Sequence, residues 1–403
     1  MFFDWWSVER KRELPPELSD VTTPEQFEKI NAYTRVRSKF SLIKATFALV
    51  VLLAFWFSGG FNALDEWVRS FDFSTITTGI IYIGILGLAN SILSLPFDLY
   101  STFVIEERFG FNKTTLRLFF IDRIKGLMLA LVLGVPLIAV ILWFFERTGS
   151  NAWLYCWIVS VAFSLALQYI APVWILSLFN KYTPLPDGDL RHAILNYAQK
   201  VHFPFKEIFV MDSSKRSTKS NAFFTGFGKY RRIALFDTLV SGSTDPEILT
   251  ILAHEVGHYK KRHIITGMLL SFLYMGFVFY LLSIFINKNE LFDAFYMKHV
   301  SVYAGLVFFG LLFEPISFLS SIAFNAFSRH NEREADQYAI ETTSDYQNLI
   351  SALKKLYANN LANLTPHPLY VFLNYTHPPL LERIRLIRAT EEHQRNQTQQ
   401  IQY

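Results

Sequence analysis

The sequence predicts a mainly α-helical, polytopic membrane protein with about six transmembrane helices and a small α+β catalytic portion that contains a β-hairpin. Charged residues make up only 18% of the 403 residues, against about 25% in typical soluble domains. Aromatic residues make up 17%, and phenylalanine alone occupies 40 positions. Six apolar stretches have the length of a membrane span, and two longer polar blocks separate or follow them. The single cysteine, Cys156, excludes an internal disulfide.

The expected spans follow from length and polarity. A helix rises 1.5 Å per residue, so about 20 apolar residues cross the hydrocarbon core. The third and fourth stretches contain no charged side chain, whereas the sixth carries Glu314 and Pro315 near its middle. A carboxylate within a span is expected to face the protein interior or water. The six spans are expected at residues 42–61, 76–97, 126–145, 152–178, 264–287 and 300–327.

The basic residues predict the orientation of the spans. The segments expected on one side hold 8, 5, 13 and 8 lysines and arginines, and those on the other side hold 1, 1 and 2. Lysine and arginine concentrate on the cytoplasmic side of membrane proteins. We therefore expect both termini and the two polar blocks in the cytoplasm, in a prokaryotic plasma membrane or the endoplasmic reticulum.

The first polar block, residues 181–263, reads as a soluble insertion of mixed structure. A Pro- and Asp-rich link is followed by an amphipathic helix at 190–201 and a strand at 206–211. Residues 222–225 and 232–236, joined through Gly226, Gly228 and Lys229, predict a β-hairpin. Asp245 and Pro246 are suited to an N-cap and a first-turn position, so a helix is expected from there to His263.

The second polar block, from residue 329 onward, predicts helices at 331–342 and 346–359 and a frayed polar tail after Thr390. The expected organisation therefore has five parts. They are an N-terminal tail with four spans at 1–180, a catalytic insertion at 181–263, two spans at 264–328, a C-terminal catalytic region at 329–390 and a tail at 391–403.

The pattern His254-Glu255-Val256-Gly257-His258 is the sharpest chemical signal. Histidines at i and i+4 on a helix lie on one face, where both can reach a tetrahedral zinc ion. Glu255 can then reach a metal-bound water without binding the metal. The alternative, two ordinary helix histidines that face water, is disfavoured because the expected helical context is present.

A catalytic zinc site needs a third protein ligand and an open position. Glu332 and Asp336 follow the sixth span at i and i+4, so one can bind zinc while the other holds a ligand imidazole. The topology returns this segment to the side of His254. Spacing alone does not distinguish Glu332 from Glu334.

With these features the chain resembles the integral-membrane zinc proteases of the CAAX prenyl protease 1 family, which carry a gluzincin-type HExxH motif. The resemblance runs from about Leu14 to Ile387. Eukaryotic members look like seven-span proteins, and only Met1 to Glu13 precede the first shared motif here, so a six-span form is expected. Besides the HExxH pattern, the motifs that carry the resemblance are residues 15–18 (PPEL), 106–113 (EERFGFNK), 214–217 (SKRS), 220–223 (SNAF), 235–239 (LFDTL), 328–336 (SRHNEREAD) and 377–383 (HPPLLER).

The resemblance implies roles for individual residues. It implies one zinc ion bound by His254, His258 and Glu332, with Glu255 as the general base. Asp336 matches an acidic residue that supports a ligand histidine or donates a proton.

The same resemblance assigns residues around the substrate. His377 and Arg383 match groups that face the catalytic centre and can stabilise an oxyanion. Asn221, Ala222 and Phe223 match an edge strand along which a peptide lies extended. The helices are expected to enclose a chamber within the membrane.

The expected function is hydrolysis of peptide bonds near the C-terminus of prenylated CAAX-type or similar membrane-associated proteins by a zinc-activated water. One alternative is a quality-control protease of the heat-shock membrane metalloprotease type. Another is a transporter or zinc-stabilised scaffold without hydrolytic activity. Nucleic acid is not an expected partner, because Lys260, Lys261 and Arg262 read as the charged end of a span that meets lipid headgroups. The sequence does not predict the oligomeric state.

Overall fold

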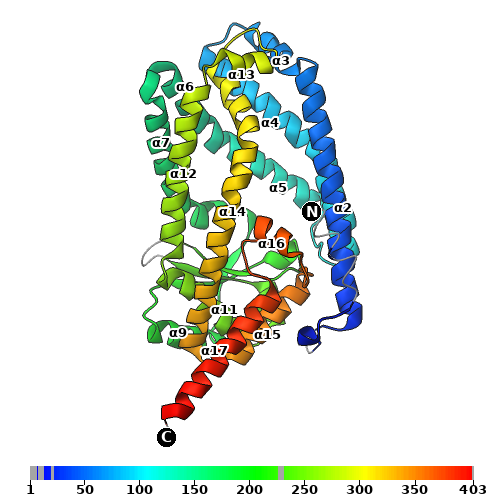
Figure 1. Ribbon diagram of the computed structural model, residues 1–403, viewed down its shortest axis with the longest axis vertical. Helices are drawn as coiled ribbons and strands as arrows, with labels where there is room; N and C mark the ends of the chain where they lie inside the picture. The colour runs from blue at the N-terminus through cyan, green and yellow to red at the C-terminus, as the bar shows by residue number, and fades with distance from the viewer. Residues whose placement is uncertain (1–6, 8–12, 20–21, 226–230, 402–403) are drawn as a thin grey trace.

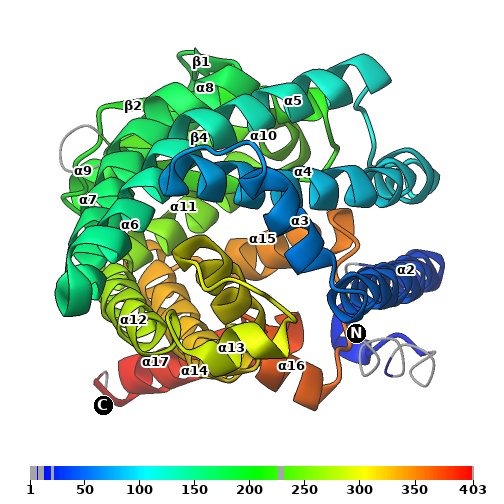
Figure 2. The same ribbon diagram turned by 90° about the horizontal axis from the view of Figure 1, so that it is seen from above.

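The computed structural model of the chain is an elongated molecule in which long helices stand above a smaller part that contains the strands (Figure 1). It describes residues 7, 13–19, 22–225 and 231–401. The expected class, a mainly helical membrane protein with a small sheet, is confirmed. Viewed from above, the long helices are arranged around the edge of the molecule (Figure 2).

Six helical segments in the described residues are long and apolar enough to cross a membrane. Ile124 and Val132, for example, are 61% and 63% exposed, so large apolar side chains cover the outer surface of these segments. Such a surface is suited to lipid, and the protein is a multi-pass integral membrane protein. The segments comprise α2 (Pro24–Phe57), α4 (Thr75–Tyr100), α5 (Leu116–Leu129) with α6 (Val135–Arg147), α7 (Ala152–Ile170), α12 (His263–Phe285) and α14 (Val302–Thr343).

The spans differ from the expected ranges at three kinds of position. The first ends at Phe57, because Gly59 adopts a left-handed conformation with φ of 73°, and Phe61 belongs to α3 (Gly60–Arg69) instead. The fourth leaves regular α-helix at Ile170 and resumes in α8 (Leu176–Phe179). Wide π-helical turns lie near Pro96, Pro136 and Pro172, each of which lacks the N–H for a regular helix bond. These turns span Ser101–Glu106, Ala130–Gly134 and Ala171–Ile175.

The end of the molecule away from the sheet is closed by α3 and by α13 (Asn289–Ala294), both at the top of Figure 1. Tyr303 of α14 donates a hydrogen bond of 2.5 Å to Asp65 of α3. Phe61 and Phe308 pack edge to face, with ring centroids 5.3 Å apart. These contacts tie the short helices to the spans.

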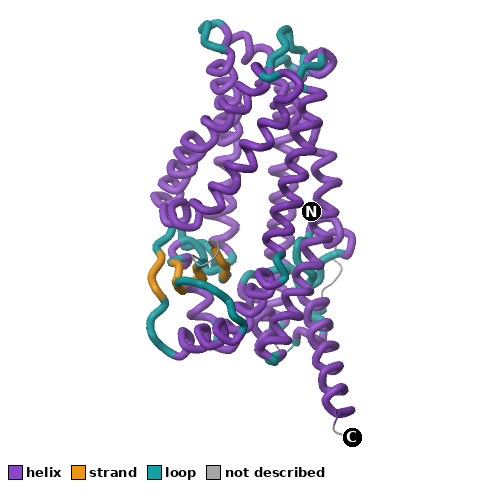
Figure 3. Tube along the Cα trace, turned by 90° about the vertical axis from the view of Figure 1, so that its left-hand side faces the viewer, coloured by secondary structure: helices purple, strands orange, loops and turns teal. Residues whose placement is uncertain are grey.

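Four strands form one sheet at the other end, in the order β1-β2-β4-β3 (Figure 3). The predicted hairpin is confirmed, since β3 (Ala222–Thr225) pairs antiparallel with β4 (Arg232–Phe236); its connecting residues 226–230 lie outside the described residues. β4 pairs parallel with β2 (Glu207–Met211). A further strand, β1 (Tyr182–Pro184), was not expected from the sequence; it lies in the proline-containing link and pairs antiparallel with β2.

Three helices pack around the sheet: α9 (Asp189–Lys200), α10 (Asp237–Gly242) and α11 (Asp245–Lys260). The expected N-cap of α11 was wrong by one residue. Thr244 is the N-cap and exchanges hydrogen bonds with Glu247, so this capping box satisfies backbone groups that Asp245 would leave open. α11 stops at Lys260 because Arg262 takes a left-handed conformation with φ of 60°, and α12 begins at His263.

The sixth span and the helix expected at 331–342 are one continuous helix, α14, of 42 residues. The two ranges, expected separately at 300–327 and 331–342, are joined because residues 328–336 contain no glycine or proline and continue the helical pattern. α14 therefore carries Glu332 from the membrane part into the catalytic part as a single rigid element.

The C-terminal helices are α15 (Tyr346–Asn359), α16 (Pro368–Asn374) and α17 (Leu380–Ile401). Beyond Thr390, where a frayed polar tail was expected, α17 continues as a helix to Ile401 through residues with ordinary helix propensity. Buried apolar side chains of α11, α15 and α17, among them Leu252, Ile350 and Ile384, form the core below the spans.

Candidate metalloprotease site

Helix α11 presents His254 and His258 one turn apart, as the sequence predicted. Their Nε2 atoms lie 3.2 Å from each other. Apolar residues of the same helix, including Ile251, Leu252 and Val256, are buried in the core. The two imidazoles are therefore held on a rigid, buried helix rather than on a loop.

Helix α14 brings Glu332 to these histidines. Glu332 Oε2 lies 3.3 Å from His254 Nε2, and Glu332 Oε1 lies 3.3 Å from His258 Nε2. The carboxylate is buried, and its Oε2 atom makes no hydrogen bond. Of the two alternatives left open by spacing, Glu332 is the one beside both histidines, whereas Glu334 lies against His263.

This cluster fits a divalent metal ion. Ligand atoms placed at about 2.0–2.1 Å from a tetrahedral zinc ion lie roughly 3.3 Å apart, close to the separations found here. A buried carboxylate whose Oε2 lies beside His254 Nε2 without a hydrogen bond, and whose Oε1 lies beside His258 Nε2, also fits a metal ligand. His254, His258 and Glu332 form the group in the described residues whose ligand atoms converge in this way.

Gly257 permits the approach of the two helices. A Cβ atom at this position would meet the Cα and carbonyl oxygen of Ala335 at 3.0 Å and the Cβ of Tyr338 at 3.1 Å. Because two of these atoms belong to the backbone of α14, a side chain here would push the helices apart. The glycine of the motif thus sets the distance between α11 and Glu332.

Asp336, one turn beyond Glu332, supports the first histidine. Its Oδ1 atom accepts a hydrogen bond of 2.8 Å from His254 Nδ1, which directs Nε2 toward the cluster. Burial alone would lower the pKa of His254, but the hydrogen bond with Asp336 and the nearby Glu332 carboxylate outweigh burial and raise this pKa to about 9.

Arg383 of α17 is paired with the same carboxylate. Its Nε and Nη2 atoms donate to Asp336 Oδ2 and Oδ1 at 2.8 and 2.6 Å. Burial lowers the pKa of Arg383, but Asp336 more than compensates and raises it above its ordinary value. Arg383 also lines the cavity described below.

His377 approaches the cluster from the turn before α17. Its Nε2 atom lies 3.2 Å from Glu332 Oε1, and its Nδ1 atom is 2.9 Å from the hydroxyl of Thr376. The side chain is 58% exposed, unlike the other members of the cluster. Although much of the ring is exposed, the protein atoms around it remove part of its hydration and lower the pKa of His377 despite the nearby carboxylate.

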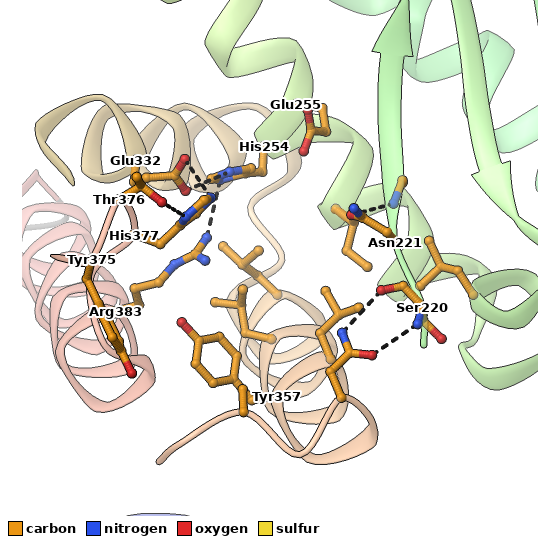
Figure 4. A pocket seen from close by; sticks show the side chains of 18 of the residues that line it. Ser220, Asn221, His254, Glu255, Glu332, Tyr357, Tyr375, Thr376, His377 and Arg383 are labelled. Carbon is orange, nitrogen blue, oxygen red and sulfur yellow. Dashed lines mark hydrogen bonds and ion pairs between the residues drawn. The ribbon is translucent and has the colours of Figure 1, made fainter. Parts of the chain in front are cut away.

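A cavity of about 530 Å³ opens onto these residues (Figure 4). Glu255 lines it together with His254, Glu332 and His377. Burial raises the pKa of Glu255 above the usual carboxyl range. A carboxylate, an imidazole and a potential metal site therefore share one space large enough for several residues of peptide.

The predicted edge strand borders the same cavity. Asn221 and Ala222 line it, and β3 pairs only with β4 among the described residues, which leaves its other edge free. Phe223 does not line the cavity and instead packs against Phe236, with ring centroids 6.2 Å apart. Alternate residues of a strand point to opposite faces, which explains the difference between Ala222 and Phe223.

Other residues of the site carry no signal that distinguishes them in the sequence. Asn360 donates to and accepts from the backbone of Ser220, at 3.2 and 3.0 Å, and so anchors the chain just before β3. Leu349, Leu353 and Leu356 form an apolar wall of the cavity. Their helical spacing was visible in the sequence, but the same spacing also describes ordinary core residues.

Comparison with known proteins agrees with this geometry. A family model described as CAAX prenyl protease N-terminal, five membrane helices, matches residues 5–181, and one described as Peptidase family M48 matches residues 184–391. The CAAX prenyl protease 1 homolog of Arabidopsis thaliana is 37% identical over 400 residues, which cover 94% of this chain and 91% of that protein.

Two yeast proteins are similar over comparable lengths. CAAX prenyl protease 1 of Saccharomyces cerevisiae is 34% identical, with 95% of this chain and 90% of that protein covered. The crystal structure of S. mikatae Ste24p superposes with a TM-score of 0.91 at 33% identity, covering 96% of this chain and 94% of that chain.

The fold and the site together define a membrane-embedded metalloprotease. The chain belongs to peptidase family M48, among the CAAX prenyl protease 1 proteins. The family membership expected from the motifs is thereby confirmed, and so is the expectation that the protein is an enzyme.

Proposed function

We propose that this protein is a zinc metalloendopeptidase that cuts prenylated CAAX-type or similar membrane-associated proteins near their C-terminus. The observation that carries the proposal is the position of Glu255 on a cavity that also contains the His254, His258 and Glu332 cluster and the open edge of β3. Relatives that are similar over nearly the whole chain are named CAAX prenyl proteases.

His254, His258 and Glu332 would hold one zinc ion. When bound, zinc supplies a Lewis acid that acidifies a water molecule and polarises a carbonyl group. Glu255 accepts a proton from the attacking water and passes it to the amine nitrogen of the leaving peptide. The raised pKa of Glu255 suits both halves of this transfer.

The remaining residues bind and orient the substrate. An extended peptide adds to the free edge of β3 beside Asn221 and Ala222 through main-chain hydrogen bonds. His377, the exposed imidazole of the cluster, lies where it can donate to the oxyanion of the tetrahedral intermediate. Arg383, which is paired with Asp336, adds positive charge near the oxyanion.

The excess of basic residues on the side of the site supports a cytoplasmic active site and cytoplasmic termini. A prenylated protein has its lipidated C-terminus at the membrane surface, so an enzyme held in that membrane meets the scissile bond directly.

The test compares two substrates on the purified full-length protein in lipid vesicles. A farnesylated CAAX peptide and its unprenylated twin are incubated with the protein, and the products are identified by mass spectrometry. We expect cleavage after the farnesylated cysteine, with the unprenylated peptide cut at least tenfold more slowly. Equal cleavage of both peptides would refute the proposed preference for prenylated substrates. Cleavage of neither peptide would overturn the proposed function.

A further inference from the structure

A series of hydrogen-bonded polar side chains continues from the metal-ligand cluster. His263 Nδ1 lies 3.1 Å from His258 Nδ1, and His263 Nε2 lies 3.0 Å from Glu334 Oε2. His263 is buried, and the rings of His258 and His263 meet edge to face with centroids 5.1 Å apart. The proposed catalytic roles use neither His263 nor Glu334.

The course of the backbone brings His258, His263 and Glu334 close together. The left-handed conformation of Arg262 separates α11 from α12 and starts α12 at His263, beside the last turn of α11. Residues two apart on a helix point about 200° apart, so Glu332 and Glu334 leave α14 on different sides. Glu332 reaches the metal-ligand cluster, and Glu334 reaches His263.

The hydrogen bonds have a definite direction. An ionised carboxylate only accepts, so His263 donates its Nε2–H to Glu334. In a neutral imidazole the other nitrogen is then an acceptor, and His263 Nδ1 accepts the Nδ1–H of His258. His258 consequently keeps the lone pair of Nε2, the atom that lies 3.3 Å from Glu332 and 3.2 Å from His254 Nε2.

We propose that His263 and Glu334 are positioning residues that hold metal ligand His258 in its binding tautomer and ring orientation. They would do for His258 what Asp336 does for His254, with an imidazole inserted between the carboxylate and the ligand. This inference rests on the metal site of the proposed function. Losing a partner of a ligand histidine typically weakens metal binding about 10- to 100-fold.

Two substitutions at position 263 separate the hydrogen bond from packing. His263→Leu fills the space but removes the acceptor for His258. His263→Asn places an amide oxygen, also an acceptor, close to the position of Nδ1. His330→Leu is the matched control, because His330 lies 3.6 Å from Glu334 on the outside of α14 and is 64% exposed.

The experiment measures zinc affinity of the full-length protein in detergent micelles by competition with a chromophoric chelator. The visible spectrum of the cobalt-loaded protein reports ligand geometry independently of activity. We expect the zinc Kd to rise at least tenfold in His263→Leu, with altered cobalt bands. In His263→Asn and His330→Leu we expect it to stay within about threefold of the unmodified protein.

An unchanged Kd in His263→Leu would overturn the inference, as would an equal loss in His330→Leu. If the metal-free His263→Leu protein melts at a lower temperature, a loss of zinc affinity could come from misfolding. The zinc Kd of Glu334→Ala is then the test, because Glu334 is 37% exposed and its removal leaves the core intact. A Kd unchanged in Glu334→Ala would then overturn it. An unmodified protein that binds no zinc refutes the proposed function itself, which distinguishes the two failures.

Discussion

Arg383 and Asp336 form a buried bidentate ion pair between α17 and α14, at 2.8 and 2.6 Å, and the same carboxylate holds His254 at 2.8 Å. The C-terminal helix thus reaches the metal-ligand cluster through Asp336, and Arg383 Nη2 also lies 3.4 Å from His254 Nδ1. Substitution of Arg383 is therefore expected to affect both the stability of the fold and the position of His254.

Replacing Arg383 by alanine should lower both stability and activity. It would leave the Asp336 charge buried without a partner, and breaking a buried pair in this way costs about 3–5 kcal/mol in the free energy of unfolding. Arg383→Lys should recover only part of this, because an ammonium group cannot make two parallel bonds to one carboxylate. Thermal melting of both variants in detergent, followed by peptide cleavage, measures the effect. Melting of Arg383→Ala at the temperature of the unmodified protein would contradict it.

Glu255→Gln should separate metal binding from proton transfer. The substituted side chain keeps its size but cannot accept a proton, and Glu255 does not belong to the converging ligand group. We expect unchanged zinc content by elemental analysis and a loss of at least 100-fold in kcat. Glu332→Gln is the informative companion, since it should reduce zinc content as well. Full activity in a Glu255→Gln preparation free of other proteases would show that another base acts.

The sequence predicted the parts of this molecule that depend on local pattern. Six apolar stretches, the hairpin and the i, i+4 histidines all have a local periodicity or composition, and each lies near its expected place. The choice of Glu332 over Glu334 depended on where α14 points after the membrane, which spacing does not contain. The resemblance to a family supplied that choice, and the contacts with His254 and His258 agree with it.

Other features depended on tertiary contacts alone. β1 forms because β2 offers a free edge to residues 182–184, although their composition is typical of a link. The link between His258, His263 and Glu334 joins three residues on three helices, and sequence spacing does not bring Glu334 to the two histidines. The extension of α14 through residue 328 was hidden by the change from apolar to charged residues, which marks a membrane boundary without ending a helix.

Gly257→Ala should disturb the distance between α11 and α14. The added methyl group would lie 3.0 Å from backbone atoms of Ala335, which cannot rotate away, so the helices must separate by a few tenths of an ångström. We expect a loss of about 1–3 kcal/mol in stability, typical of overpacking, and weaker zinc binding because Glu332 moves with α14. Gly267→Ala in α12 is the matched control, since a Cβ there meets no atom within 4 Å. Equal melting temperatures and zinc affinities for the two variants would contradict the role assigned to Gly257.

Lys219 should hold the chain that leads into β3, the proposed peptide-binding strand, against the helices that carry Tyr33 and Glu106. Its Nζ atom donates to Glu106 at 2.8 Å and to the hydroxyl of Tyr33 at 2.9 Å, and it lies 4.4 Å from the centroid of the Phe111 ring. Lys219 directly precedes Ser220 and Asn221, which line the cavity. Lys219→Met keeps the length of the side chain but removes the charge, and it leaves a partly buried carboxylate without its cation. We expect a loss of about 1–3 kcal/mol in stability and a higher KM for peptide with a smaller change in kcat.

Lys215→Met provides the comparison, because Lys215 pairs with Asp212 only three residues away and does not join separate parts of the chain. A half-exposed pair between residues three apart in sequence contributes about 0–1 kcal/mol, so its removal should leave the melting temperature and KM nearly unchanged. Steady-state cleavage of one peptide by both variants distinguishes the two lysines. If Lys219→Met lowers kcat while KM stays constant, Lys219 acts on the reacting groups rather than on the strand that binds the peptide. If both variants behave alike, the contact between Lys219 and Glu106 has no part in substrate binding.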